Sequence, residues 1–88
     1  MELIPIQQYH KFEIREGQVE HALKRLFATK GVKKITIQPS PPRPGFACEF
    51  FVELQSEMSG DRYEFFEDVA EQLVANDVAV EYAPFCVD

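Results

Sequence analysis

The run from Phe46 to Leu54 constrains the fold of this chain more than any other stretch. Apolar side chains occupy every second position, at 46, 48, 50, 52 and 54, while Glu49 and Glu53 lie at alternate positions. Successive side chains of a β-strand point to opposite faces, so the run predicts a strand with one buried face. Phe51 breaks the pattern, because its ring shares the polar face with the two glutamates. The main functional question is therefore what contacts that face.

The remaining elements are predicted from the same kind of pattern. Alternation predicts strands over residues 8–14, 32–38 and 78–82, the first with His10, Phe12 and Ile14 inward. An amphipathic helix that ends at Gly31 is predicted from the apolar positions Val19, Ala22, Leu23, Leu26 and Phe27. A second helix is predicted over 61–75, with Asp61 and Glu64 forming a capping box. Its buried positions are expected to be Phe66, Val69, Ala70, Leu73 and either Phe65 or Val74.

The element order β-α-β-β-α-β predicts an α+β fold. Short connections and right-handed crossovers favour a ferredoxin-like sandwich, with a four-stranded antiparallel sheet in the order 4-1-3-2 and two helices on one face. The 88 residues are expected to form one domain over positions 1–88. Residues 39–45 hold four prolines and a glycine, which predicts a stiff connector between the second and third strands.

Charge is distributed unevenly along the chain, whose net charge is −6. Residues 1–45 hold eight Lys or Arg against four acids, a net +4, whereas residues 46–88 hold only Arg62 against eleven acids, a net −10. No apolar run approaches the roughly 20 residues that span a bilayer, and no signal peptide is evident. A cytoplasmic protein with reduced thiols and no membrane contact is expected.

The face opposite the helices is the predicted interaction surface. Its expected members are Tyr9, Lys11, Glu13, Lys34, Thr36, Glu49, Phe51, Glu53, Ala79 and Glu81. Aromatic rings on two central strands resemble the base-stacking platform of RNA-recognition domains, but the two glutamates and the acidic second half argue against nucleic acid. A second copy of the chain is the favoured partner, with its Lys11 and Lys34 meeting the glutamates. Alternatively, Phe51 is an ordinary exposed ring, or residues 3–6 or the C-terminal tail cover it.

Two other segments are candidate contact sites. Glu64, Glu67 and Glu71 form an acidic stripe on the second helix, which suits a basic protein partner. The alternative is a solvated helix face whose acids pair with Lys24, Arg25 and Lys30. Arg43 lies among P-x-x-P spacings, so residues 39–44 form either a contact arm or a simple connector.

No catalytic or cofactor motif is present in the sequence. His10, Cys48 and Cys86 could converge at one end of the sheet, but their spacing is poor for zinc, and no metal or cofactor is expected. The sequence favours a non-enzymatic interaction or regulatory domain that forms a homo-oligomer or acts as an acidic accessory or inhibitory protein. The alternative is a dimeric small-molecule-binding or catalytic domain with His10, Tyr82 and Phe51 around a pocket between sheet and helices.

Overall fold

The structure, a computed structural model, describes the backbone of residues 3–5 and 8–86 and the side chains of residues 9–82. Six strands and two helices are found in these residues. Their bounds in chain order are β1 Leu3–Pro5, β2 Gln8–Arg15, α1 Val19–Phe27, β3 Val32–Gln38, β4 Phe46–Leu54, β5 Glu57–Ser59, α2 Gly60–Ala75 and β6 Ala79–Cys86.

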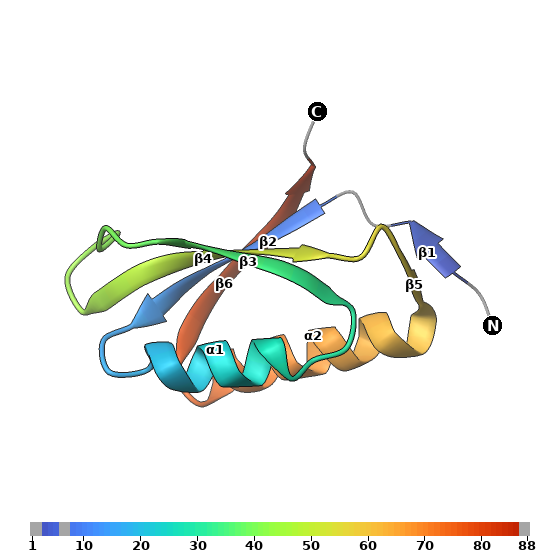
Figure 1. Cartoon of the computed structure of the whole chain (residues 1–88). Helices are drawn as coiled ribbons and strands as arrows, with labels where there is room; N and C mark the ends of the chain where they lie inside the picture. Colours follow the sequence, from blue (N-terminus) through green and yellow to red (C-terminus); the bar gives the residue numbers. More distant parts are fainter. Residues whose placement is uncertain (1–2, 6–7, 87–88) are drawn as a thin grey trace.

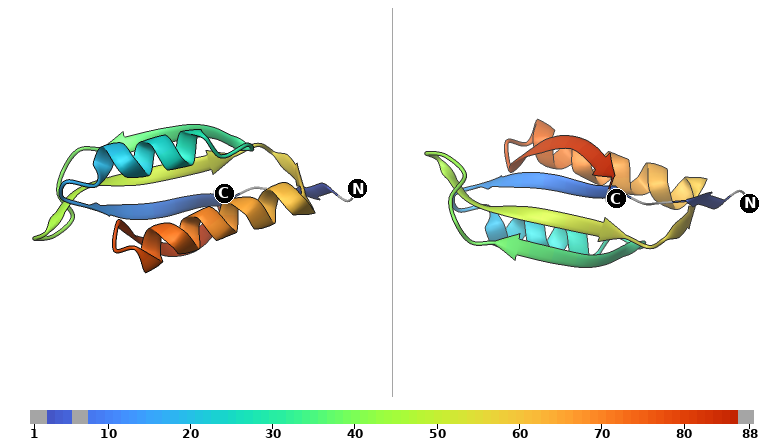
Figure 2. Two further views of the ribbon diagram at one scale, coloured as in Figure 1. Left: turned by 90° about the horizontal axis from the view of Figure 1, so that it is seen from below. Right: turned by 90° about the horizontal axis from the view of Figure 1, so that it is seen from above.

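The main sheet is four-stranded and antiparallel, with the order β3-β4-β2-β6. Figure 1 shows both helices on one side of this sheet, and Figure 2 shows the other side with no described helix in front of it. The predicted α+β chain with a four-stranded antiparallel sheet and two helices is confirmed. The predicted strand order 4-1-3-2 is wrong for this chain. Two short strands that were not predicted, β1 and β5, pair with each other, and with these strands counted the order of the main sheet is β3-β4-β2-β6.

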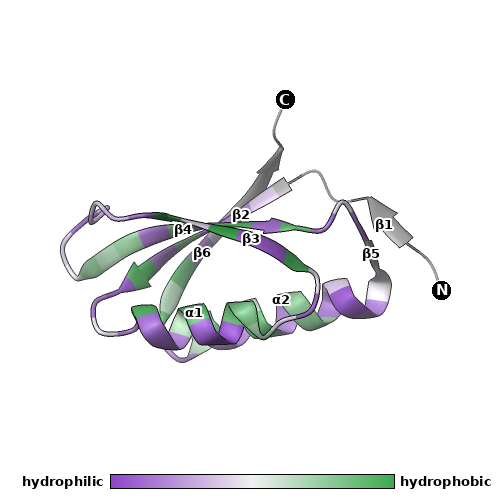
Figure 3. Ribbon diagram, viewed as in Figure 1, coloured by the Kyte–Doolittle hydropathy of each residue, from purple (hydrophilic) through white to green (hydrophobic). Residues whose placement is uncertain are grey.

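The core lies between the helices and one face of the sheet. All five inward positions of β4 are buried, as the alternation predicts, and hydrophobic and hydrophilic bands alternate along this strand in Figure 3. From β2 come His10, Phe12 and Ile14, and from the helices Ala22, Leu26, Phe66, Val69, Ala70 and Leu73. The Phe, Ile, Leu and Val side chains of this layer each contribute about 1.5–3 kcal/mol when fully buried, so they supply much of the driving force for folding.

Both helices differ from prediction at their ends. Phe27 is 62% exposed and Phe65 57% exposed, and Val74 is exposed too, so the apolar stripes are narrower than predicted. The N-cap of α2 is Ser59 rather than Asp61, since the Ser59 hydroxyl accepts a hydrogen bond from the Arg62 amide at 3.3 Å. Serine at this position satisfies one of the amides that the first turn leaves without a partner.

β6 is longer than predicted and presents the opposite side chains to the core. It continues through Pro84, which edge strands tolerate, beside a register irregularity opposite β2. Ala79 is buried, and Glu81 lies in register with fully buried Phe12, so both face the helices. Tyr82 lies in register with Lys11 on the open face. The predicted placement of Ala79 and Glu81 on the open face is therefore wrong.

Candidate functional site

The open face is organised around a rank of four side chains that crosses all four strands. Thr36 pairs with Phe51, Phe51 with Lys11 and Lys11 with Tyr82. The Lys11 ammonium lies 5.0 Å from the centre of the Tyr82 ring, within the range of a cation–π contact. The rank thus combines two partly exposed aromatic rings with one cation at the centre of the sheet.

The carboxylates beside this rank have partners within the same chain. Lys11 Nζ lies 2.8 Å from Glu49 Oε2, and this contact raises the pKa of Lys11. The Tyr9 hydroxyl donates to Glu53 Oε1 at 2.8 Å, and Lys33 Nζ lies 3.6 Å from Glu53 Oε2. Within one chain, Lys11 is thus the ion-pair partner of Glu49, and Lys33 rather than Lys34 is the ion-pair partner of Glu53. Contact of Lys11 and Lys34 with the glutamates of a second copy stays a prediction.

The Tyr9–Glu53 hydrogen bond is testable by titration. The donated hydrogen bond is the main cause that holds the pKa of Glu53 below its ordinary value, and the same contact raises the pKa of Tyr9. Tyr9→Phe is expected to raise the pKa of Glu53 toward that of a free glutamate, as measured by carbon-detected NMR. Since a carboxyl with a lowered pKa stabilises the fold above its unfolded pKa, this stabilisation disappears as the pH falls through the folded pKa. An unchanged Glu53 titration in Tyr9→Phe would contradict the assignment.

Arg43 attaches the proline-rich connector to the sheet. Its guanidinium lies 2.7 Å from Glu13 Oε1 and 3.4 Å from the Tyr82 hydroxyl, to which it donates. It also stacks 4.7 Å from the centre of the Phe46 ring. The contact with Glu13 is an ion pair without ideal hydrogen-bond geometry, since Oε1 accepts no hydrogen bond in the described part of the chain. Arg43 is therefore engaged within its own chain, and this favours the connector over the contact arm.

Glu13 and Glu49 lie directly opposite each other on β2 and β4. Like charges at such positions repel, so each carboxylate needs its own cation. Lys11 serves Glu49 and Arg43 serves Glu13. The two ion pairs together neutralise this end of the open face.

The acidic stripe of α2 lies on the outer side of the molecule. Glu64, Glu67 and Glu71 are exposed, and none makes an ion pair with any other side chain among residues 9–82. The expected pairing with α1 is absent there, because Lys24 pairs with Glu20, and Arg25 donates to Gln72 at 2.6 Å. The stripe is therefore available to solvent or to a cationic surface.

His10 is a core residue. It is 2% exposed, with Nδ1 3.3 Å from Glu81 Oε1 and its ring edge-on to Phe66 at 4.7 Å. Its Nε2 is buried without a hydrogen-bond partner among the described residues. Glu81 is only partly buried, so this pair joins the core to the edge strand β6.

The structure separates the residues of the possible metal site. His10 pairs with Val52 while Cys48 pairs with Ile14, so the two are four strand residues apart, roughly 13 Å at about 3.3 Å per residue. Burial raises the pKa of the Cys48 thiol, which favours an unreactive core residue. The side chain of Cys86 lies outside the described residues. Across the described residues no group of three potential ligands is close enough to hold a metal ion.

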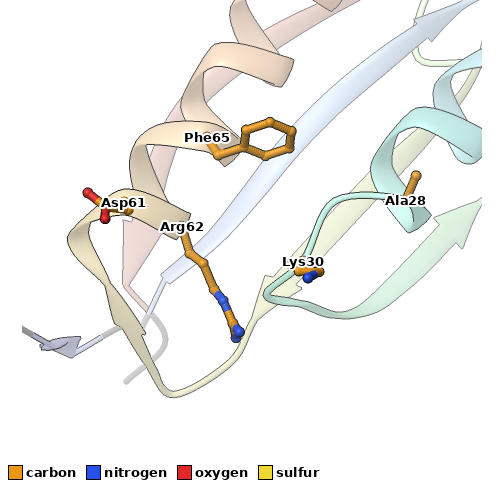
Figure 4. Close-up of a pocket in the computed structure, with 5 residues that line it drawn as sticks. All are labelled: Ala28, Lys30, Asp61, Arg62 and Phe65. Carbon is orange, nitrogen blue, oxygen red and sulfur yellow. The ribbon is translucent and has the colours of Figure 1, made fainter. Parts of the chain in front are cut away.

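The pocket proposed around His10, Tyr82 and Phe51 is not formed, because His10 faces the helices while the other two face away from them. A cavity lies instead between the end of α1 and the start of α2, lined by Ala28, Lys30, Asp61, Arg62 and Phe65 (Figure 4). No pattern in the sequence identifies this set, because Phe65 was one of two candidates for the last buried position of the second helix. The sole local signal is an aromatic residue one helical turn from Arg62.

Within the described residues, no helix is both long and apolar enough to cross a membrane. Comparison of the chain with models of protein families, with curated proteins and with solved structures found no match.

Proposed function

We propose that this chain is a ferredoxin-like domain that acts through protein contacts, by packing its open sheet face against the same face of a second copy. The fold assignment is supported by the strand order, since β4 separates β2 from β3, and β2 separates β4 from β6. The segments that contain α1 and α2 therefore each cross over one strand on the same face of the sheet.

The observation that carries the interface proposal is the rank Thr36-Phe51-Lys11-Tyr82. It lies at the middle of a face that no described helix covers, and its rings provide apolar area with little conformational entropy to lose. The carboxylates beside it already have cationic or hydroxyl partners. Covering the face therefore removes few unpaired charges from water, and this lowers the desolvation cost of association.

The charge distribution also favours this orientation. On the open face, the carboxylates of Glu13, Glu49 and Glu53 are offset by four cations, Lys11, Lys33, Lys34 and Arg43. Helix α2 holds five acids and one arginine, a net −4, on the opposite side of the sheet. Two copies joined sheet to sheet keep these acidic helices far apart, whereas association through the helices brings like charges together.

The described backbone of the N-terminal strand lies at the end of the main sheet rather than over its open face. The backbone of β1 pairs with β5, beyond the end of the main sheet (Figure 1). β6 extends to Cys86 as the partner of Gln8, so its backbone forms the sheet edge. The described backbone of both segments therefore lies away from the middle of the open face. Ile6 and the side chains of residues 83–88, which were also considered as covers for Phe51, lie outside the described residues.

A charge introduced into the rank is expected to separate the copies. Phe51→Glu and Thr36→Glu are each expected to weaken self-association about 30-fold or more, as measured by sedimentation velocity. Phe65→Glu is the matched control, since it adds the same charge at an exposed ring on the helix side. Equal weakening by Phe65→Glu would contradict a sheet interface, and circular dichroism establishes that each variant is folded.

A second function, contact with a basic protein, is supported by the unpaired stripe on α2. Glu67→Lys combined with Glu71→Lys is expected to reduce binding of a poly-lysine probe more than Glu16→Lys with Glu20→Lys, which changes the net charge equally. Binding should also weaken steeply with added salt. Equal losses from the two double variants would show that overall charge, not the stripe, governs binding.

A further inference from the structure

A cavity of about 280 Å³ lies on the helix side of the molecule, where the end of α1 approaches the first turns of α2. Its size is close to the lower end of the roughly 300–1,000 Å³ that is typical of small-molecule sites. Figure 4 shows the Phe65 ring directed across the cavity toward Ala28, so that an aromatic face and a methyl group form its apolar part.

Two cations stand beside this apolar part. The Arg62 side chain extends to the same side of the cavity as Lys30, whereas the Asp61 carboxylate points to the other side of the helix (Figure 4). Neither cation makes an ion pair with a carboxylate in the part of the chain whose side chains are described. Arg62 is the single cation among residues 46–88, which otherwise hold eleven acids. The cavity thus brings Lys30, from the basic first half of the chain, to the same place as the single cation of the acidic second half.

Phe65 is an exposed aromatic residue on the helix side of the molecule. Its ring is 57% exposed, and full burial of such a ring is worth about 1.5–3 kcal/mol. An exposed ring beside two cations forms a site at which a planar ligand can stack while its charged group meets the cations.

We propose that this cavity binds a small aromatic carboxylate, with the ring of the ligand against Phe65 and Ala28 and its carboxylate between Lys30 and Arg62. The ring of the ligand would pack against the apolar part of the cavity. Its negative charge would pair with the two cations. The site is independent of the sheet interface, because it lies on the opposite side of the sheet.

The probe is 2-naphthoate, added to the full chain while amide signals are followed by ¹H–¹⁵N NMR. Saturable shifts are expected at Ala28, Lys30, Arg62 and Phe65, with a Kd on the order of 1 mM for a ligand of this size. Acetate supplies the charge without the ring, and 2-naphthylmethanol supplies the ring without the charge. Both are expected to bind at least about fivefold more weakly than 2-naphthoate.

Variants separate the two parts of the site. Lys30→Gln and Arg62→Gln are each expected to raise the Kd about three- to fivefold, and Phe65→Ala about tenfold. Lys24→Gln is the control, since it removes one exposed cation of α1 that does not line the cavity. All four positions are exposed, so folding should be retained. Binding of 2-naphthylmethanol as tight as that of 2-naphthoate, an unchanged Kd in Phe65→Ala, or shifts centred on the open sheet face would overturn the proposal.

Discussion

Replacing Gly31 by alanine is expected to lower the free energy of unfolding by about 2–5 kcal/mol. Gly31 has a φ of +99°, a conformation that costs a residue with a Cβ about 1–2 kcal/mol. An added Cβ would also overlap the end of the Met58 side chain, which contacts this position through its methyl and sulfur atoms. Met58 is 1% exposed and packed in the core, so its displacement adds an overpacking cost of about 1–3 kcal/mol.

Gly17 provides the matched control for this change. Its φ is +79°, but nothing lies within 4 Å of an added Cβ, so Gly17→Ala should cost only the backbone strain. In a Met58→Ala background, Gly31→Ala should cost as little as Gly17→Ala, because the obstructing atoms are gone. Urea denaturation of the four variants measures these differences. If Gly31→Ala and Gly17→Ala were equally destabilising in the wild-type background, the contact with Met58 would have no energetic weight.

Arg43→Met is expected to destabilise the chain by about 1–3 kcal/mol. The change leaves Glu13, which is only 5% exposed, without its cation and opposite Glu49. It also removes the hydrogen bond to Tyr82, while methionine keeps part of the apolar contact with Phe46. The expected cost is less than that of breaking a fully buried pair, because the Arg43 side chain is half exposed to solvent.

The unpaired charge on Glu13 is the expected cause of the destabilisation by Arg43→Met, and a second substitution tests this cause. Glu13→Gln in the Arg43→Met background should recover much of the lost stability, since the neutral amide has a smaller desolvation cost and no repulsion from Glu49. Lys24→Met is the matched control, because it breaks an exposed pair with Glu20 and should cost less than about 0.5 kcal/mol. Thermal and urea unfolding of these three variants, with Glu13→Gln alone as the fourth, measure the coupling. A cost for Arg43→Met no greater than that for Lys24→Met would show that the connector is not attached through this residue.

The elements that could be predicted from the sequence are those with a strong local pattern. The alternation in β4 correctly predicts which of its side chains are buried, and β3 has the predicted bounds. The four core positions of α2 were predicted for the same reason, since Phe66, Val69, Ala70 and Leu73 follow helical spacing. In each case, the spacing of apolar residues within one element is enough to identify its buried face, without any knowledge of the elements packed against it.

The errors lie where a tertiary contact outweighs the local pattern. In β6 the apolar residues Val80 and Tyr82 suggest an inward face, yet Glu81 faces inward, where buried His10 can hydrogen-bond to it. Arg43 was predicted as a contact residue because nothing local shows that it reaches Glu13, which lies 30 positions earlier. The cavity near Phe65 was missed because it forms only when the ends of two helices meet.

The interface proposal is tested most directly by the mass of the unmodified protein in solution. Light scattering after size exclusion, at loading concentrations from about 10 to 300 µM, covers the range in which a standard interface associates. The proposal predicts a mass that rises from the monomer value of 10.2 kDa toward twice that value. A mass that stays at 10.2 kDa at the highest concentration would contradict it.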